Sequence, residues 1–267
     1  MQADAFFRMG STHAVCQDYA THTKIGDVTF VAVADGCSSS PDTDFGARLL
    51  TRAFAESVEQ LPWQTSRSVA LAAQRMSVAL GLPKESLDST LLTVTQRHDE
   101  GPLLIQQFGD GAVLYRSHTG WHYESVDFDK NAPNYPRYSL CENDSLAYNE
   151  FVGHATITRG EKGADGIWKT WSTVVPLDEH RAMRLTLSTE ACDVALVMTD
   201  GVHSFQDAGG MPVPVEAVLD ELIAFKGYAG QFVARRCMRF LDKTCAERGW
   251  KHADDFAVAG IYVGEAP

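Results

Sequence analysis

Four aspartates stand where hydrophobic, strand-forming segments begin or end: Asp35, Asp110, Asp200 and Asp254. Glycine follows directly after the first three, and Asp-Gly is a common turn dipeptide because it tolerates positive φ. A turn therefore explains any one of them. Four carboxylates at strand tips are harder to explain as turns alone, because crowding Asp35, Asp200 and Asp254 into one cleft costs free energy unless cations compensate their charge.

Aspartate oxygens without supporting histidine or cysteine clusters favour Mg²⁺ or Mn²⁺ over zinc. Two such ions about 3.5–4 Å apart activate a water between them and polarise a phosphoryl oxygen. Glycine after a ligand aspartate fits this chemistry, because a residue without a Cβ lets the backbone approach an ion and offer its carbonyl oxygen. These residues therefore indicate metal-assisted hydrolysis of a phosphate ester.

Hydrophobic periodicity predicts the elements that must bring these carboxylates together. The predicted strands are 28–34, 89–96, 103–108, 112–116, 121–126, 194–198 and 256–263, with regular structure also expected over 168–175. The predicted helices are 44–61, 66–80, 215–225 and 229–248. Long stretches of adjacent strands favour antiparallel sheets over a doubly wound parallel one. We therefore expect an α+β fold, a four-layer α/β/β/α sandwich with two central, mainly antiparallel sheets.

The 267 residues contain no repeat and no obvious interdomain linker, so we expect one domain over residues 1–267. Within it, the stretch from about 127 to 166 has no clear period, which is typical of a flap or an irregular insertion. The formal net charge of −12 argues against nucleic acid as a partner, because a phosphate-binding face needs a basic excess.

No segment approaches the roughly 18 apolar residues of a membrane span, and residues 1–10 lack the apolar core of a secretory signal. The six cysteines are scattered and form no C-x-x-C pair, which argues against a structural zinc site and a disulfide scaffold. None is followed by arginine at the spacing of the cysteine-phosphatase loop. We therefore expect a cytoplasmic monomer that does not bind membranes.

Short motifs around these aspartates occur in an order that is similar to a known family. They are Ala34-Asp35-Gly36, Gly109-Asp110-Gly111, Thr199-Asp200-Gly201 and Asp254-Asp255, together with Asp88-Ser89-Thr90 and the opening Gly10-Ser11-Thr12-His13 followed by Cys16-Gln17-Asp18. The set resembles the metal-dependent protein phosphatases of the 2C type (the PPM family), and its opening resembles a divergent bacterial branch. The resemblance spans residues 10–263. Each motif is weak alone, but their order and spacing make the set specific.

This resemblance implies two Mn²⁺ or Mg²⁺ ions and assigns ligands to them. Asp35 would bridge both ions, and Gly36 would give its carbonyl to one. Asp200 and Asp254 would complete the shell of the second ion. Asp110 matches the position that supports a weaker third ion in bacterial members.

The catalytic side of the resemblance is less complete. Asp18 resembles the family's early acid, which orients metal-bound waters. His13 stands where members often carry a phosphate-binding arginine. A histidine can donate a hydrogen bond to phosphate or protonate the leaving group, although a structural hydrogen bond explains a lone histidine equally well. Asp255 stands where the family usually has asparagine and is expected to hold no metal. The usual Gly-Asp-Ser-Arg reads Gly-Asp-Gly-Ala at 109–112, so a neighbouring basic group is lost.

The implied activity is hydrolysis of phosphoserine or phosphothreonine in proteins by a metal-activated water, with no phosphoenzyme intermediate. The implied partner is a phosphorylated protein substrate. Whether that substrate is a cognate serine/threonine kinase stays open. The lost arginine leaves a second hypothesis open: a catalytically weak family member that binds phosphoproteins or regulates a partner. A third, a haloacid-dehalogenase-like phosphatase, needs Asp-x-Asp at the end of the first strand, and residue 33 is valine.

Overall fold

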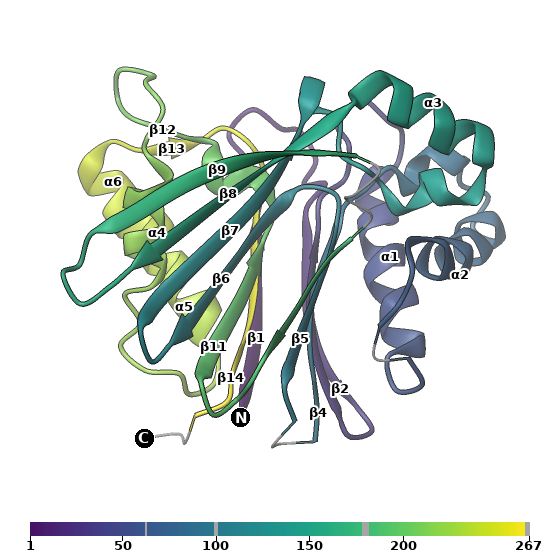
Figure 1. Cartoon of the computed structure of the whole chain (residues 1–267). Helices are drawn as coiled ribbons and strands as arrows, with labels where there is room; N and C mark the ends of the chain where they lie inside the picture. The colour runs from purple at the N-terminus through teal and green to yellow at the C-terminus, as the bar shows by residue number, and fades with distance from the viewer. Residues whose placement is uncertain (62, 99–100, 178–181, 265–267) are drawn as a thin grey trace.

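Two β-sheets stack face to face between helices in the computed structural model, which describes residues 1–61, 63–98, 101–177 and 182–264 (Figure 1). In spatial order the larger sheet contains β1 (Gln2–Arg8), β14 (Phe256–Tyr262), β11 (Cys192–Met198), β6 (Gly111–Ser117), β7 (Gly120–Phe128), β8 (His154–Lys162) and β9 (Trp168–Pro176). The smaller sheet contains β10 (Met183–Leu187), β5 (Leu103–Phe108), β4 (Leu91–Arg97), β3 (Val28–Ala34) and β2 (Tyr19–Ile25). The pairings within both sheets are antiparallel.

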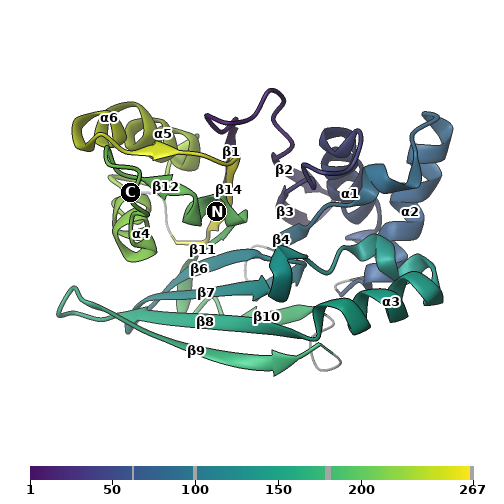
Figure 2. The same cartoon turned by 90° about the horizontal axis from the view of Figure 1, so that it is seen from above.

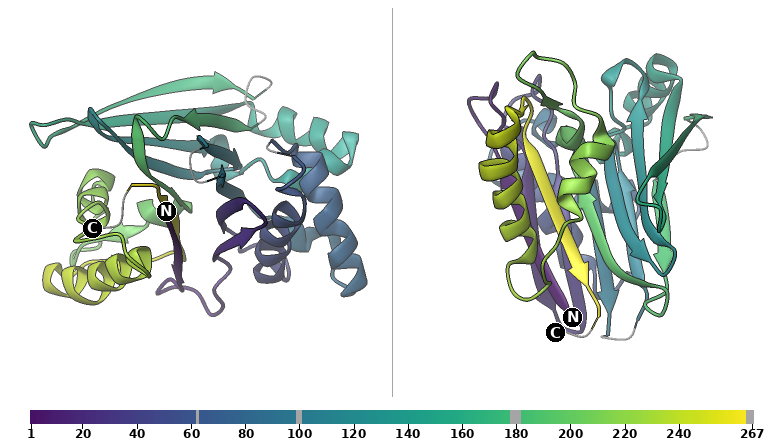
Figure 3. Two further views of the ribbon diagram at one scale, coloured as in Figure 1. Left: turned by 90° about the horizontal axis from the view of Figure 1, so that it is seen from below. Right: turned by 90° about the vertical axis from the view of Figure 1, so that its left-hand side faces the viewer.

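Helices cover the outer face of each sheet (Figure 2). Helices α1 (Thr43–Ser57) and α2 (Ser66–Ala79) lie on the smaller sheet, and α4 (Val215–Leu222), α5 (Phe232–Arg239) and α6 (Cys245–Arg248) lie on the larger one. A five-residue π-helical segment, Phe240–Thr244, joins α5 to α6, so the three pieces form one rod along the sheet (Figure 3). The expected four-layer α/β/β/α sandwich with two antiparallel sheets is confirmed.

Strand β3 shows why a continuous apolar run belongs in the middle of this sandwich. Its residues are all buried, and successive side chains point to opposite faces. Phe30 packs in the core under α1 and α2, whereas Val31 and Val33 pack between the two sheets. A strand covered on both faces has no solvent side, so its sequence shows no polar alternation. Burial of each large apolar side chain contributes roughly 1.5–3 kcal/mol.

Most predicted elements exist with shifted ends, and several elements were not predicted. The helix expected over 44–61 ends at Ser57, and the one expected over 229–248 begins at Phe232. β1, β2 and β10 are additional strands. Asp4 interrupts the apolar pattern of β1, yet it is buried because it accepts a hydrogen bond from the backbone N–H of Ala234. The hydrophobic pattern therefore did not predict this strand, because it contains a buried polar residue with a specific hydrogen-bond partner.

The lack of a clear period over 127–166 suggested an irregular insertion, but this stretch contains regular elements. It contains the end of β7, helix α3 (Glu142–Val152), the whole of β8 and two short 3₁₀ turns. The pattern failed because α3 buries only Tyr148 and Val152, and β8 lies near the edge of the larger sheet. A helix and a strand that bury so little leave no periodic signal. No helix in the described ranges is long and apolar enough to span a membrane.

Candidate metal centre and active site

The strand-end aspartates meet at one end of the sandwich, the upper end in Figure 1, because of how the strands pair. The end of β11, which Asp200 follows closely, is in register with the starts of β6 and β14, and Asp254 closely precedes β14. In the other sheet, the end of β3 before Asp35 lies beside the start of β4 and hence beside the end of β5. The chain crosses from β5 to β6 through the turn that carries Asp110, which joins the two groups.

Burial and mutual repulsion raise the pKa values of the aspartates at this end. Burial raises the pKa of Asp35 to about 7; its hydrogen bond with Asp18 opposes the rise, and Asp254 adds to it. Burial is also the largest cause of the raised pKa values of Asp18, Asp110 and Asp200, and the charge of Asp35 contributes to all three. Asp18 and Asp110 are buried, while Asp35 and Asp200 keep part of their surface in solvent.

Asp18 is held in place by a threonine from another strand end. The Oγ1 of Thr199 donates a 2.6 Å hydrogen bond to Asp18 Oδ2 and accepts one of 3.0 Å from the backbone N–H of Ala257. The backbone N–H of Thr199 also donates to the carbonyl of Ala257 at 3.1 Å. Because β11 and β14 are thus joined at Thr199, its hydroxyl is fixed, and it orients one carboxylate oxygen of Asp18.

Asp35 is anchored through its backbone, which leaves its carboxylate free for other contacts. Its N–H donates to Thr90 Oγ1 at 3.1 Å, and its carbonyl accepts from Ser89 Oγ at 2.7 Å and from the N–H of Thr90 at 2.8 Å. At Gly36 a Cβ atom would lie 2.7 Å from the backbone carbonyl oxygen of Thr43, at the start of α1. Only glycine allows this close approach of the chain.

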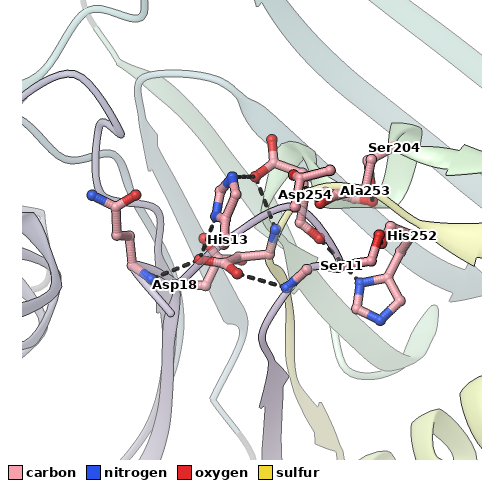
Figure 4. Close-up of polar contacts among 12 residues, drawn as sticks. Ser11, His13, Asp18, Ser204, His252, Ala253 and Asp254 are labelled. Carbon is pink, nitrogen blue, oxygen red and sulfur yellow. Dashed lines mark hydrogen bonds and ion pairs between the residues drawn. The ribbon is translucent and has the colours of Figure 1, made fainter. Parts of the chain in front are cut away.

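Asp255 fastens the N-terminal loop to the start of β14. This residue is only 2% exposed, and its carboxylate accepts from the N–H of Gly10 at 2.7 Å and of Gln17 at 2.6 Å. His13, on the same loop, lies between two acids (Figure 4). Its Nε2 is 3.3 Å from Asp254 Oδ1, and its Nδ1 is 3.1 Å from Asp255 Oδ2 without the alignment of a hydrogen bond.

Both ring nitrogens of His13 therefore face carboxylates, and the ring binds a phosphate oxygen only if one of these contacts opens. Asp254 is the more accessible of its partners, with a side chain 44% exposed. It also accepts a 2.8 Å hydrogen bond from the N–H of Asp255. Next to it, a Cβ at Gly201 would fall 1.7 Å from the carbonyl oxygen of Asp255, so this glycine is what lets the turn after β11 pack on the start of β14.

The chemistry of this donor set fits hard divalent cations. Across the described residues, no three histidine, cysteine, aspartate or glutamate side chains converge closely enough to hold a metal ion. The carboxylates nevertheless raise one another's pKa values, and the buried Oδ1 of Asp110 has no hydrogen-bond partner. Buried carboxylates in this situation are stabilised by a cation or by protonation.

Three side chains near this end were not assigned a role from the sequence. Thr199 positions Asp18, Asp255 holds the N-terminal loop, and Asp127 at the end of β7 adds to the raised pKa values of Asp110 and Asp200. Asp127 follows a predicted strand directly, so the rule that found the other aspartates would also have found it. No comparable sequence pattern distinguishes Thr199 or Asp255 from the other residues of their motifs.

A buried ion pair connects this end to the stretch between β7 and β8. Arg137 Nε donates to Asp88 Oδ1 at 2.5 Å, and Ser40 Oγ donates to the other oxygen at 2.8 Å. The carbonyl of Asp88 accepts from the N–H of Cys37, two residues after Asp35. The segment that carries Arg137 is therefore tied to the loop that follows β3.

The solved structures similar in fold to this chain include several bacterial phosphatases. A mutant bacterial serine phosphatase has a TM-score of 0.58 at 10% identity, over 100% of this chain and 99% of that one. The serine/threonine phosphatase of S. agalactiae has a TM-score of 0.52 at 13% identity, over 98% and 99%. The phosphatase domain of SpoIIE from Bacillus subtilis, with a fragment of its regulatory domain, has a TM-score of 0.54 at 11% identity, over 98% and 63%.

At such low identity these structures establish the fold alone, and a comparison with curated protein sequences finds no match. The sequence itself settles the family. A profile described as Protein phosphatase 2C matches residues 10–225, which is more than half of the chain. This range includes Asp18, Asp35, Asp110 and Asp200, whereas Asp254 lies beyond it. The chain is therefore a member of the protein phosphatase 2C family.

Proposed function

We propose that the protein is a Mn²⁺- or Mg²⁺-dependent phosphatase that removes phosphate from phosphoserine and phosphothreonine in proteins. The observation that carries the proposal is the group of aspartates whose pKa values are raised by burial and by one another, within a member of the 2C family. Divalent cations relieve this repulsion. When bound, they activate water as a nucleophile and polarise the phosphoryl group.

We assign the metal ligands as the resemblance implies. Asp35 and the carbonyl of Gly36 would hold one ion, and Asp35, Asp200 and Asp254 the other, with Asp110 supporting a weaker third. The raised pKa values of Asp35 and Asp200 support this assignment, because a bound cation would stabilise the ionised carboxylates in place of the protons that they lose.

Asp18 and His13 would act on the reactants. Thr199 orients Asp18 through one carboxylate oxygen. Once the hydrogen bond between Asp18 and Asp35 opens, Asp18 can also accept a hydrogen bond from the attacking water and so orient it. His13 Nε2 is the candidate to bind a phosphate oxygen or to protonate the departing seryl oxygen, once its contact with Asp254 opens.

Residues 127–166 would form a flap beside the site within a single domain over 1–267. The Arg137–Asp88 pair supports this assignment, because it joins the flap to the loop that follows Asp35. Helix α3 would then present its exposed face, with Leu146 and Phe151, to a phosphoprotein substrate. Comparing the phosphoproteome with and without the active protein would identify that substrate and would show whether it is a cognate kinase.

Hydrolysis of p-nitrophenyl phosphate with and without Mn²⁺ tests the proposal. We expect Mn²⁺-dependent turnover that D200N lowers by about 100-fold or more, since metal activation is worth several kcal/mol. The matched control D27N makes the same chemical change at an exposed turn between β2 and β3 and should retain activity. Turnover that ignores both Mn²⁺ and D200N would refute the enzyme assignment.

A catalytically weak family member that binds phosphoproteins is the second candidate. His13, which replaces the usual arginine and contacts two acids, favours it. Calorimetric titration with Mn²⁺ separates the two candidates. An active enzyme takes up metal and hydrolyses phosphopeptides, whereas a binding module takes up metal poorly and retains phosphopeptides unchanged.

A further inference from the structure

A cavity of about 360 Å³ lies between the end of α4 and the helix α5. The described residues that line it all fall within 224–239, so it belongs to one helix–turn–helix segment. The turn is at the end of the sandwich opposite the aspartates: the N–H of Gly230 donates to Gln2 Oε1 at the start of β1, and β1 runs from there toward Gly10. The cavity is therefore separate from the candidate active site.

The floor of the cavity is apolar and well ordered by packing. The rings of Phe225 and Phe232 lie 5.6 Å apart between centroids, tilted by 57°. Phe232 is buried in the core under α4 and α5, and Phe225 packs against the same core. Met238 adds a flexible, partly exposed side chain to the rim. These side chains form a concave surface that suits an aromatic or aliphatic group.

The rim of the cavity is cationic. Lys226, Arg235, Arg236 and Arg239 line it, and none of its described lining residues is acidic. This is notable in a chain with 35 acidic and 23 basic residues. Lys226 and Arg239 are exposed, and neither makes an ion pair with any residue in the described part of the chain. The local charge thus opposes the net charge of the protein, and it selects for anions.

Arg236 is the buried member of this rim. The residue is 8% exposed; its Nη2 donates to Glu221 at 2.8 Å and its Nη1 to the carbonyl of Ala224 at 3.3 Å. Its Nε is buried and has no hydrogen-bond partner. Because this nitrogen has almost no accessible surface and the guanidinium is already paired with Glu221, the cations that a ligand can reach include the exposed Lys226 and Arg239.

We propose that this cavity binds a small organic carboxylate, with its apolar body against the surface formed by Phe225 and Phe232 and its charge beside Lys226 and Arg239. A small ligand fits better than a peptide, because the lining comes from a single segment rather than from a groove that crosses several elements. The volume lies within the range of small-ligand pockets, roughly 300–1,000 Å³.

Binding of 4-phenylbutyrate, 4-phenylbutyramide and 4-phenylbutylamine to the whole chain tests the proposal, because these probes share one apolar body and differ in charge. The readout is the shift of the Gly227 backbone amide in two-dimensional NMR titrations. For a probe of about 12 non-hydrogen atoms, we expect a dissociation constant of roughly millimolar or below for the acid. The amide should bind at least about fivefold more weakly, and the amine should not bind.

Two variants and a matched control complete the experiment. R239E should weaken binding of 4-phenylbutyrate about tenfold, and R75E, which makes the same change at an exposed position of α2, should leave it within about twofold. A224W should fill the cavity and abolish binding while the thermal midpoint stays near that of the unmodified protein. Equal binding of acid and amide, shifts confined to other residues, or binding that survives A224W would each overturn the proposal. So would an acidic peptide that binds here when 4-phenylbutyrate does not.

Discussion

Asp255 accepts two backbone hydrogen bonds from the loop that carries His13 and precedes Asp18, and replacing it with alanine removes both acceptors. The N–H of Gly10 lies in a buried position and would keep no partner in that variant. Asparagine, the usual residue of the family here, keeps one acceptor oxygen but turns an NH₂ donor toward the other N–H. D255A should therefore lower the stability of the protein more than D255N does.

The magnitude follows from the two contacts. Hydrogen bonds to a charged group contribute roughly 1.5–3 kcal/mol each. We therefore expect D255A to lower the free energy of unfolding by about 3–5 kcal/mol and D255N by about 1–2 kcal/mol. Both variants should also lower kcat/KM, because the loop that they loosen positions His13 and Asp18.

Urea unfolding followed by tryptophan fluorescence measures this difference, provided that the slope with denaturant stays constant. D254N is the matched control. The side chain of Asp254 is 44% exposed, and asparagine can keep its one backbone hydrogen bond, so D254N should cost less than about 1 kcal/mol of stability. Its effect on Mn²⁺-dependent turnover should nevertheless be large. A cost below about 1 kcal/mol for D255A, or equal costs for D255A and D255N, would refute the reasoning.

Three further changes test other contacts. Asp35 has a pKa of about 7 when folded and near 3.8 otherwise, so the native state holds more protons between these values. In EDTA, the thermal midpoint of the protein should fall as pH rises from about 4 to 7. D35N should make this fall smaller, although Asp18, Asp110 and Asp200 still contribute to it, and Mn²⁺ should oppose it. T199V removes the hydroxyl between Asp18 and β14 and should lower kcat about tenfold, while T199S, which keeps the hydroxyl, should not. R137M leaves Asp88 buried without its cation and should cost about 3–5 kcal/mol in urea unfolding, part of which R137M/D88N should recover.

The parts of the fold that were predictable from sequence are those in which neighbouring residues share one environment. β3 is buried on both faces, so its apolar run shows that environment directly. The tips of β3 and β11 were equally visible, because each apolar run stops at an Asp-Gly pair. That these tips meet at one end followed from the resemblance. Physically, β11 pairs with β6, and the turn from β5 to β6 leads to the sheet in which the end of β3 lies beside the start of β4 and the end of β5.

The rest depends on contacts between segments that are distant in sequence. The role of Asp255 requires the loop at 10–17, which lies more than 230 residues earlier. The orientation of Asp18 requires a hydroxyl at Thr199, and a threonine at a strand end has many other uses. α3 bears no pattern because its exposed face is nearly the whole helix. Rules based on neighbouring residues in the sequence do not predict such contacts.

The position of β14 in the larger sheet constrains the order in which the chain can fold. β14 pairs with β1 on one side and β11 on the other, and Gln2 is in register with Tyr262. Closing so long a loop carries a large entropic cost that is recovered only when both partners are present. During synthesis the larger sheet therefore lacks the strand between β1 and β11 until nearly the whole chain has emerged, and β1 has no strand to pair with until then. Asp254 and Asp255 are synthesised together with that strand, so the candidate metal site and the sheet that supports it are completed in the same late step.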